Sequence, residues 1–400
     1  MLVDRPRAIL RVLRSFRVHP AVALVGPRQC GKTTLARMIA AQEEGVTHFD
    51  LERTVDQRKL KTPELTLAPL RGLVIIDEIQ RAPHLFETLR VLLDRRDATT
   101  RFLLLGSASP SLTRGAAETL AGRVGLVDLS GFDLDEIQGH TNSNAPQFWR
   151  KLWIRGGFPR SFLAPDAPGS VLWRESFVRT FLERDIPQFG ISMPAASLHR
   201  FWTMVAHYHG QTWNAAEFAR SIGAGQTTAR RYLDVLSDTQ VVRILNPWHE
   251  NLKKRQVKSP KIYVRDTGLL HSLLELESFS ALSGHPKAGA SFEGFGVEQV
   301  LSYVNPRRAH FWATHGGAEL DLLIALGAKR YGFEFKYSDA PGSTRSMRIA
   351  MRDLSLEKLW IVYPGIERYA VDSEITVLPI RDVPILLGDL ELSASDSVDS

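Results

Sequence analysis

Short apolar segments alternate with amphipathic ones in the first third of the chain. Residues 21–25, 73–76 and 101–105 are almost entirely apolar. Apolar runs of this length are typical of buried parallel strands, and the periodic segments between them predict helices. The alternation predicts an α/β domain over residues 1–140, with a parallel sheet flanked by helices.

Helical periodicity dominates the next part of the chain. A turn is expected at 156–159, and the segment 176–186 places its apolar residues on one helix face, at Phe177, Val178, Phe181, Leu182 and Ile186. This pattern predicts a helical lid or connector over residues 141–194.

A helix-turn-helix pattern follows within residues 195–283. Asn214 is a favourable N-cap for a first helix, the glycines at 223 and 225 break it, and a second helix is expected over 227–237. Two apolar segments, each expected to form a strand, flank a basic loop. These elements predict a winged helix-turn-helix, which could bind DNA or serve as a rigid protein-binding or lid module.

The last domain is predicted over residues 284–390 and has α/β character. One helix and three strands are expected, at 291–303, 309–313, 319–326 and 331–337. The final residues, 391–400, are small, polar and acidic, which predicts a disordered tail.

The clearest chemical motif begins where the first apolar run ends. It fits G-x-x-x-x-G-K-[ST] without a mismatch, and a helix is expected after it. The glycines let the backbone fold so that its N–H groups face phosphate oxygens, Lys32 neutralises charge, and Thr33 offers a hydroxyl to Mg²⁺. The predicted nucleotide-binding residues are Gly26, Pro27, Arg28, Gln29, Cys30, Gly31, Lys32, Thr33 and Thr34.

Two carboxylates follow the second apolar run. Asp77 and Glu78 would lie at the carboxyl end of a buried parallel strand, the edge at which such sheets bind ligands. We expect Asp77 to hold Mg²⁺ together with Thr33, and Glu78 to polarise the attacking water. Taken alone, the pair could also be two acids favoured at the start of a helix.

Two further residues are candidates for catalysis. Ser107 ends the third apolar run and could sense the γ-phosphate, although a strand that ends in small residues has the same appearance. Arg123 follows a helical segment and could act as an arginine finger on the nucleotide of a neighbouring subunit, which would require a homo-oligomer. A solvated surface arginine is the alternative.

Charge favours an acidic partner without identifying one. The net charge is +6 and the isoelectric point is about 9.4. Five of the positive charges lie between Lys253 and Lys261. If the second helix of the helix-turn-helix entered a DNA groove, the contacts would come from Gln226, Thr227, Arg230 and Arg231, with Lys253, Lys254, Arg255 and Lys258 on phosphates.

A second candidate site lies in the last domain. Period-two alternation places Glu334 and Lys336 on one face of their strand, and Asp321 is a charged residue inside an otherwise apolar strand. Two carboxylates on adjacent strands with a nearby lysine could bind a divalent metal ion and activate water against a phosphodiester. The alternative is an exposed strand face with a Glu–Lys pair.

The sequence also limits the setting of the protein. No secretory signal and no apolar run long enough for a membrane span are apparent, and the arginine-rich segment 1–18 is expected to form an amphipathic helix on the first domain. Cys30 is the one cysteine, so the chain cannot form an internal disulfide. These features predict a cytoplasmic protein.

Several motifs together resemble a large bacterial and archaeal family of AAA-type ATPases with a C-terminal domain of unknown function. They are GPRQCGKT, LVIIDEIQ, LLLGSAS, LAGR, RGGFP and ERDI. The segments SFEGFGVEQV, AELDLLI and YGFEFKYS resemble a PD-(D/E)xK nuclease fold, a restriction-endonuclease-like α/β domain. This resemblance implies site residues Glu293, Asp321, Glu334 and Lys336, with Leu320 replacing the proline and Phe335 at the variable position.

The sequence therefore predicts an Mg²⁺-dependent ATPase that acts as a switch or motor on DNA. The expected cofactors are ATP and Mg²⁺, with a second Mg²⁺ or Mn²⁺ at the C-terminal site. One alternative is a nucleotide-gated protein-interaction switch with a catalytically silent nuclease-like scaffold. Another is a DNA nuclease gated by ATP.

Overall fold

The computed structural model describes residues 3–95, 99–108, 119–140, 147–250 and 255–396, with side chains described up to 390. The chain divides into two compact units. The first comprises Met1–Gly131, Asp185–Ile191 and Asp238–Gln240, and the second comprises Phe132–Arg184, Ser192–Ser237 and Val241–Ser400.

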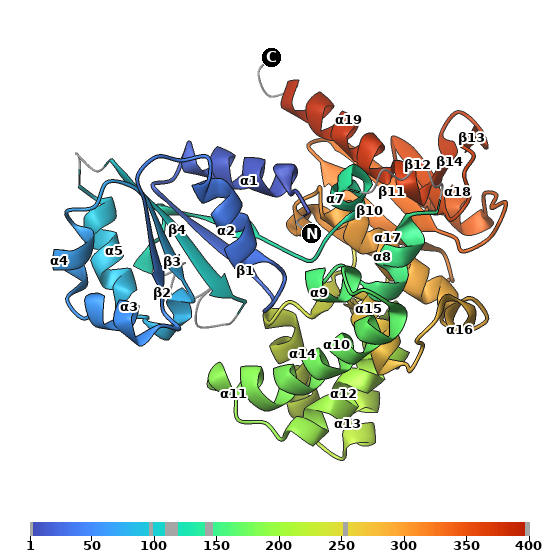
Figure 1. Cartoon of the computed structure of the whole chain (residues 1–400). Helices are drawn as coiled ribbons and strands as arrows, with labels where there is room; N and C mark the ends of the chain where they lie inside the picture. Colours follow the sequence, from blue (N-terminus) through green and yellow to red (C-terminus); the bar gives the residue numbers. More distant parts are fainter. Residues whose placement is uncertain (1–2, 96–98, 109–118, 141–146, 251–254, 397–400) are drawn as a thin grey trace. The chain divides into compact units, whose positions relative to one another are not determined.

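The first unit contains a five-stranded parallel sheet in the order β2-β3-β4-β1-β5 (Figure 1). Its strands are β1 (Ala21–Gly26), β2 (Val46–Asp50), β3 (Gly72–Asp77), β4 (Thr100–Ser107) and β5 (Val124–Asp128). Gly26 pairs with Ser107 in register, so the ends of β1 and β4 coincide. The three apolar runs are thus the three central strands, as predicted.

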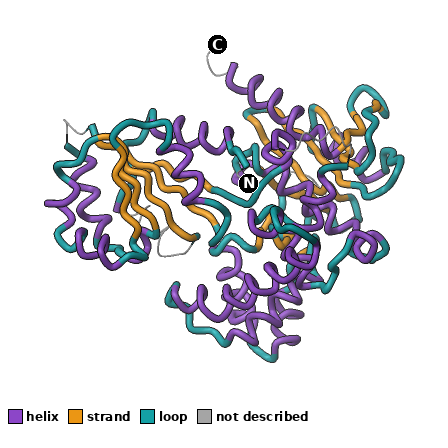
Figure 2. The backbone as a smooth tube through the Cα atoms, viewed as in Figure 1, coloured by secondary structure: helices purple, strands orange, loops and turns teal. Residues whose placement is uncertain are grey.

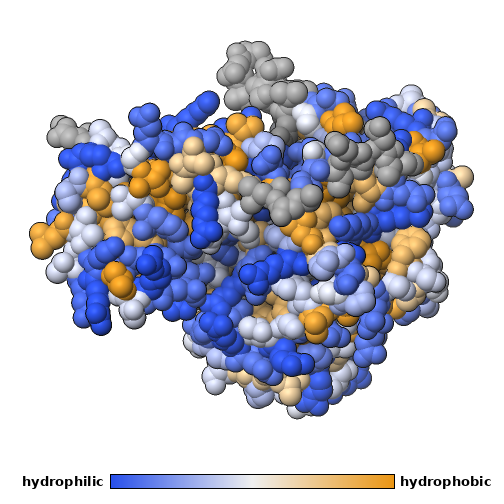
Figure 3. Space-filling view, in the orientation of Figure 1, coloured by the Kyte–Doolittle hydropathy of each residue, from blue (hydrophilic) through white to orange (hydrophobic). Residues whose placement is uncertain are grey.

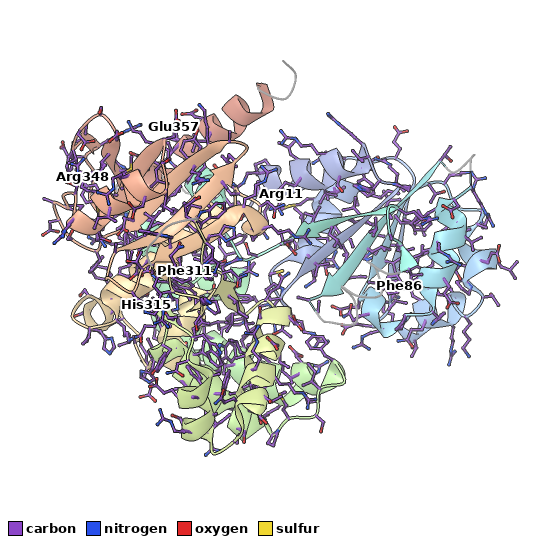
Figure 4. The ribbon with its side chains drawn as sticks, turned by 180° about the vertical axis from the view of Figure 1, so that it is seen from behind. Arg11, Phe86, Phe311, His315, Arg348 and Glu357 are labelled. Atoms are coloured by element: carbon purple, nitrogen blue, oxygen red, sulfur yellow. The ribbon has the colours of Figure 1, made fainter. Side chains whose placement is uncertain are left out.

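Helices flank this sheet on both faces (Figure 2). They are α1 (Pro6–Phe16), α2 (Lys32–Ala40), α3 (Thr54–Lys59), α4 (Pro63–Leu67) and α5 (Leu85–Leu93), with a 3-10 turn at Ile79–Arg81. The short helix α11 (Ile186–Gln188) also belongs to this unit. Alternate residues of β1 pack with Leu85 and Leu89 of α5 in one core cluster. Phe86 of α5, labelled in Figure 4, belongs to the same cluster. The arginine-rich helix α1 buries Ala8 and Val12, as expected for an amphipathic helix.

The second unit begins at Phe132, before the predicted boundary at 140, and the three parts predicted after that boundary form one compact unit. Helix α7 (Leu134–His140) explains the earlier boundary, because Leu134 donates its backbone N–H to Gln299 at 2.8 Å. The connector is helical as predicted. Its elements are α8 (Trp149–Arg155), α9 (Pro159–Phe162), α10 (Ala167–Thr180) and a π-helical turn (Phe181–Asp185).

The helix-turn-helix pattern corresponds to α13 (Ala215–Ile222) and α14 (Gln226–Asp238) after α12 (Ala195–His207). Asn214 caps α13, and Gly223 ends it at φ 65°, a left-handed conformation that favours glycine. Strands β6 (Gln211–Thr212), β8 (Lys261–Val264) and β7 (Val242–Leu245) form an antiparallel sheet in that order. The elements match the prediction, while their assignment as a DNA-binding winged helix stays a prediction.

A six-stranded mixed sheet forms the C-terminal part, in the order β13-β14-β12-β11-β10-β9. The strands are β9 (Ala309–Ala313), β10 (Glu319–Leu326), β11 (Lys329–Phe335), β12 (Lys358–Tyr363), β13 (Tyr369–Ala370) and β14 (Ile375–Pro379). The remaining helices are α15 (Thr267–Leu273), α16 (Phe279–Ser283), α17 (Ala288–Leu301), α18 (Arg345–Asp353) and α19 (Val383–Asp396), with 3-10 turns at Pro306–Arg308 and Ile380–Asp382. The pairing of β10 with β9 shifts register between Leu320 and Leu323. This irregularity lies at Asp321, and β-bulges are common beside functional sites.

The predicted disordered tail is wrong for residues 391–396. Helix α19 continues to Asp396, and residues 397–400 lie outside the described part. The buried start of the helix, at Val383, Leu386 and Leu387, supplies the packing. Once such a helix is nucleated, each added residue gains a backbone hydrogen bond, so small residues can extend it.

None of the described helices is long and apolar enough to cross a membrane. Figure 3 shows hydrophilic residues on the visible face of each unit, with smaller groups of hydrophobic residues between them. This distribution fits units whose apolar side chains lie mainly in cores.

Gly294 of α17 gives a test of packing in the second unit. A Cβ atom there would lie 2.1 Å from Nε2 of the buried His209, whose Nδ1 accepts a hydrogen bond from the Val264 N–H at 3.0 Å. We expect Gly294→Ala to lower the free energy of unfolding by roughly 1–3 kcal/mol, measured by urea denaturation. Gly289→Ala in the same helix is the matched control, because its Cβ would meet no atom within 4 Å. Equal effects of the two substitutions would contradict this packing.

Candidate nucleotide site

The phosphate loop joins the end of β1 to the start of α2. Two of its residues have positive φ, Gln29 at 63° and Gly31 at 102°, which folds the backbone tightly between strand and helix. Gly26 cannot carry a side chain, because a Cβ atom would lie 2.1 Å from the Leu129 carbonyl oxygen. Cys30 is fully buried and is a free cysteine.

Lys32 is buried at the first turn of α2, with 6% of its surface exposed. Its Nζ donates hydrogen bonds to two loop carbonyls, those of Gly26 at 3.0 Å and Pro27 at 2.9 Å. The loop therefore holds the ammonium group in place, and the N-terminus of α2 adds its positive dipole end. A buried ammonium beside a helix N-terminus suits a phosphate ligand.

Thr33 connects the loop to the tip of β3. Its hydroxyl donates to Asp77 Oδ2 at 2.7 Å, and Asp77 Oδ1 accepts the backbone N–H of Glu78 at 2.9 Å. The structure thus brings together the two residues that the sequence assigned to Mg²⁺. A hydroxyl and a carboxylate oxygen are hard ligands of the kind that this ion prefers.

Glu78 adopts a left-handed conformation, with φ 57° and ψ 43°. Such a conformation is uncommon for a residue with a side chain and often marks a functional position. Burial raises the pKa of Glu78, while the nearby positive charges of Lys32 and Arg28 oppose the rise. Its carboxylate accepts a hydrogen bond from the Gln80 side chain. Glu78 therefore lies within the electrostatic reach of the phosphate loop.

Ser107 lies at the tip of β4, next to Gly26 in the sheet. It is 1% exposed, and its hydroxyl has no hydrogen-bond partner among the described residues. A buried polar atom without a partner costs free energy, so its presence at a strand tip between loop and acids requires an explanation. A phosphate oxygen of a bound nucleotide would supply the missing partner, and the residues present thus fit a nucleotide with Mg²⁺.

The sequence did not indicate the contacts that Arg5 makes with the phosphate loop, nor those that Arg28 makes from within the loop. Arg5 is buried and donates to the carbonyl oxygens of Cys30 at 3.1 Å, Ser130 at 3.2 Å and Gly131 at 3.1 Å. One arginine among several in this basic segment gives no signal for such a role.

Arg28 forms an ion pair with Asp185, and its NH2 donates to Gln188 Oε1 at 2.7 Å. Asp185 belongs to the ERDI motif, which was the available signal in the sequence. Arg28 of the phosphate loop therefore pairs with the ERDI motif through Asp185.

Arg123 lies at the amino ends of the strands, whereas the phosphate loop lies at their carboxyl ends. The Arg123 carbonyl oxygen accepts the N–H of Ala21, the first residue of β1, at 3.3 Å, and the loop follows Gly26, the last residue of that strand. At about 3.3 Å per residue, this places it roughly 17 Å from the loop of its own chain. The guanidinium is held by Asp94 at 2.6 and 2.9 Å. Arg123 therefore lies away from the nucleotide site of its own chain, and both its role as a finger in trans and the alternative of a surface arginine stay predictions.

The predicted DNA-contacting side chains of α14 are exposed, namely Gln226, Thr227, Arg230 and Arg231. Arg230 pairs with Asp234 one turn later at 2.9 Å. Arg255 and Lys258 are also exposed, while Lys253 and Lys254 lie outside the described residues.

Lys261 does not belong to this basic surface, although the sequence grouped it there. It is 4% exposed and pairs with carboxylates of the C-terminal site. The reason is its place at the start of β8, the middle strand of the three-stranded sheet, where all four residues are buried.

The structure brings Glu293, Asp321, Glu334 and Lys336 together in the second unit, while their role as a nuclease-like site stays a prediction. Burial and the Asp321 carboxylate raise the pKa of Glu293 to about 7 and that of Glu334 to about 8, so the three carboxylates lie close to one another. Lys336 Nζ lies 2.9 Å from Glu334 Oε2. Asp321 Oδ2 accepts the backbone N–H of Phe335 at 3.0 Å.

Three members of this cluster, Lys261, Tyr263 and Glu319, were missed by the sequence analysis. Lys261 Nζ lies 3.0 Å from Glu293 Oε1, which also accepts the Tyr263 hydroxyl at 2.7 Å, and 2.5 Å from Glu319 Oε1. No local motif signals Lys261 and Tyr263, because two helices lie between β8 and the carboxylates. Within the described part of the chain, no three His, Cys, Asp or Glu residues are arranged to hold a metal ion.

The first unit therefore has the fold and the site of a P-loop ATPase. Residues 18–138 match the family model described as an AAA domain. Residues 146–280 and 288–383 match two models described as domains of unknown function, DUF8612 and DUF4143.

The chain is 49% identical over 383 residues to the uncharacterized protein Rv2008c of Mycobacterium tuberculosis, covering 96% of this chain and 85% of that protein. The uncharacterized protein Mb2031c of Mycobacterium bovis matches to the same extent. The chain belongs to the family of these mycobacterial proteins.

Solved structures show weaker similarity. The Walker-type ATPase paby2304 of Pyrococcus abyssi is 13% identical, with a TM-score of 0.49, and the match covers 68% of this chain and 96% of that one. The RuvB Holliday junction branch migration motor of Thermotoga maritima is 18% identical, with a TM-score of 0.31 and coverage of 60% and 89%.

The site geometry separates nucleotide binding from hydrolysis. We expect Lys32→Ala to abolish ATP binding, because the loop loses its buried ammonium group, and Glu78→Gln to retain binding while slowing hydrolysis at least about 100-fold. Equilibrium binding of a fluorescent ATP analogue and phosphate release measure the two effects. Equal loss of nucleotide affinity in both variants would contradict the assigned roles.

Proposed function

We propose that this protein is an Mg²⁺-dependent ATPase that works as a switch or motor on DNA. The observation that carries the proposal is the constellation at one edge of the parallel sheet. The buried Lys32 ammonium, the Thr33–Asp77 hydrogen bond and the Ser107 hydroxyl, which has no partner in the described part of the chain, meet there. Cytoplasmic location stays a prediction.

Each residue has a role that follows from its position. Lys32 and the loop N–H groups would bind the phosphates, and Thr33 with Asp77 would hold Mg²⁺. The ion supplies charge neutralisation on the β- and γ-phosphate oxygens. Glu78 would orient the attacking water, and Ser107 would bond to the γ-phosphate, so that it detects hydrolysis.

A route from nucleotide to the second unit is available along the chain itself. Asp185–Ile191 belongs to the first unit, and the residues before and after it belong to the second. Arg28 of the phosphate loop holds this segment through Asp185 and Gln188. A change at Arg28 on nucleotide binding would therefore act on the chain that leaves α10 and enters α12. The π-helical turn at Phe181–Asp185 would be the hinge, since such turns often occur at functional sites.

Action on DNA is supported by the exposed polar and basic side chains of α14 and by Arg255 and Lys258. The competing function is a nucleotide-gated protein-interaction switch. It is favoured by the buried ion pairs of the C-terminal site, which suit a scaffold. The deciding experiment is whether single-stranded, duplex or branched DNA changes the ATPase rate of the purified protein.

Contacts by α14 predict a salt-dependent loss of DNA affinity. We expect the double substitution of Arg230 and Arg231 by alanine to weaken DNA binding and to reduce the slope of log K against log salt by about one unit per lost phosphate contact. Fluorescence anisotropy at several salt concentrations measures both. Replacing the exposed pair Arg307 and Arg308 removes the same charge elsewhere and is the control. The proposal fails if both pairs have the same effect.

The position of Arg123 predicts catalysis between subunits. Arg123→Ala should retain ATP affinity and lose hydrolysis by roughly 10³-fold, since an arginine finger contributes this much or more. Mixing it with Lys32→Ala should restore part of the activity, because one mixed interface combines an intact loop with an intact arginine. Phosphate release from mixed and separate variants is the measurement. A wild-type protein that hydrolyses ATP as a monomer in analytical ultracentrifugation would exclude this arrangement.

A further inference from the structure

We propose that the Lys261 ammonium group is the resident cation of the carboxylate cluster in the second unit, and that it takes the place of the divalent metal ion on which DNA cleavage would depend. The inference goes beyond the ATPase function and concerns a separate site. It assigns the nuclease-like domain a structural role and excludes metal-dependent cutting by the wild-type chain.

The geometry places one ammonium group among three carboxylates. Lys261 Nζ lies 3.0 Å from Glu293 Oε1, 2.5 Å from Glu319 Oε1 and 3.6 Å from Asp321 Oδ1. These carboxylates come from α17 and from β10, whereas the lysine comes from β8. The Lys261 side chain therefore links its own strand to α17 and β10. A metal ion would link these elements in the same way, whereas the lysine does so through ion pairs and hydrogen bonds.

The surroundings hold this cation firmly. The Lys261 side chain is 5% exposed, and its Nζ lies 5.7 Å from the ring centroid of Phe311, a residue of β9 labelled in Figure 4. The aromatic face adds a favourable interaction with a desolvated cation. Glu319 is the exposed member of the group, at 46%, so the cluster borders on solvent there.

The other acidic partners are also occupied. Glu334 pairs with Lys336, Glu293 accepts the Tyr263 hydroxyl, and Asp321 accepts a backbone N–H. Removing a carboxylate oxygen from the Tyr263 hydroxyl or the Phe335 N–H to ligate a metal ion would leave that buried donor without a partner, at a cost for each.

The first experiment compares Mn²⁺ binding by the nucleotide-free wild type and its Asp321→Asn variant, by calorimetry at millimolar Mn²⁺ and mildly alkaline pH. Proton competition for the ligands is weakest under these conditions. We expect identical traces, because no metal ion enters the cluster. Binding by the wild type that Asp321→Asn removes would overturn the proposal, whether or not the protein hydrolyses ATP.

The second experiment removes the resident cation. We expect Lys261→Met to lower the melting temperature and to gain Mn²⁺ binding. Mn²⁺ should then raise the melting temperature of this variant again. Both effects of Mn²⁺ should be lost in the Lys261→Met, Asp321→Asn double variant. Lys329→Met is the control, because that lysine pairs with Glu357 at 3.6 Å on the surface and its loss should change neither quantity. A stably folded Lys261→Met protein that binds no Mn²⁺ would overturn the proposal. If Lys261→Met does not fold, the wild-type comparison still decides.

Discussion

Parallel strand pairing is the constraint on which the nucleotide site depends. Because β1, β3 and β4 run in the same direction, and β1 and β4 end in register, the carboxyl ends of these strands bring together the phosphate loop, Asp77 and Ser107. Each of these residues is local to its own strand, and only the pairing makes them neighbours. The Thr33–Asp77 hydrogen bond then joins the loop to a strand two positions away in the sheet. The same pairing places Arg123 at the amino ends of the strands, which separates its chemistry from the site of its own chain.

The sequence predicted this site well because its signals are local. A strand, a glycine-rich turn and a helix are encoded within a few consecutive residues, and parallel topology does the rest. Strand boundaries such as 309–313 and 319–326 were predicted to the residue for the same reason, as turn residues flank alternating apolar positions. The buried contacts of Arg5 could not be predicted, since its partners are carbonyl groups as far away as Gly131. Backbone acceptors carry no sequence signature.

Lysines show the limit of the sequence analysis most clearly. Lys261 and Lys258 are neighbours in a basic segment, yet one is buried in an acidic cluster and the other is exposed. Strand β8 begins between them, and pairing with β6 and β7 decides which lysine turns inward. Charge counts along the chain cannot distinguish the two. A basic run is therefore weaker evidence for DNA binding than its total charge suggests, and the exposed side chains of α14 carry more of the argument.

The two candidate sites differ in how their buried polar groups are satisfied. At the nucleotide site, the Ser107 hydroxyl has no partner among the residues that the structure describes and Lys32 is held by neutral carbonyls, so a phosphate ligand would add interactions to both. At the C-terminal site, lysines and backbone donors already pair with the carboxylates. Because a buried polar group is costly unless it is paired, the first arrangement is built to gain from a ligand and the second is complete without one. The protein therefore combines a nucleotide site that would gain interactions from its ligand with a C-terminal site in which we propose that ion pairs take the place of a metal ion.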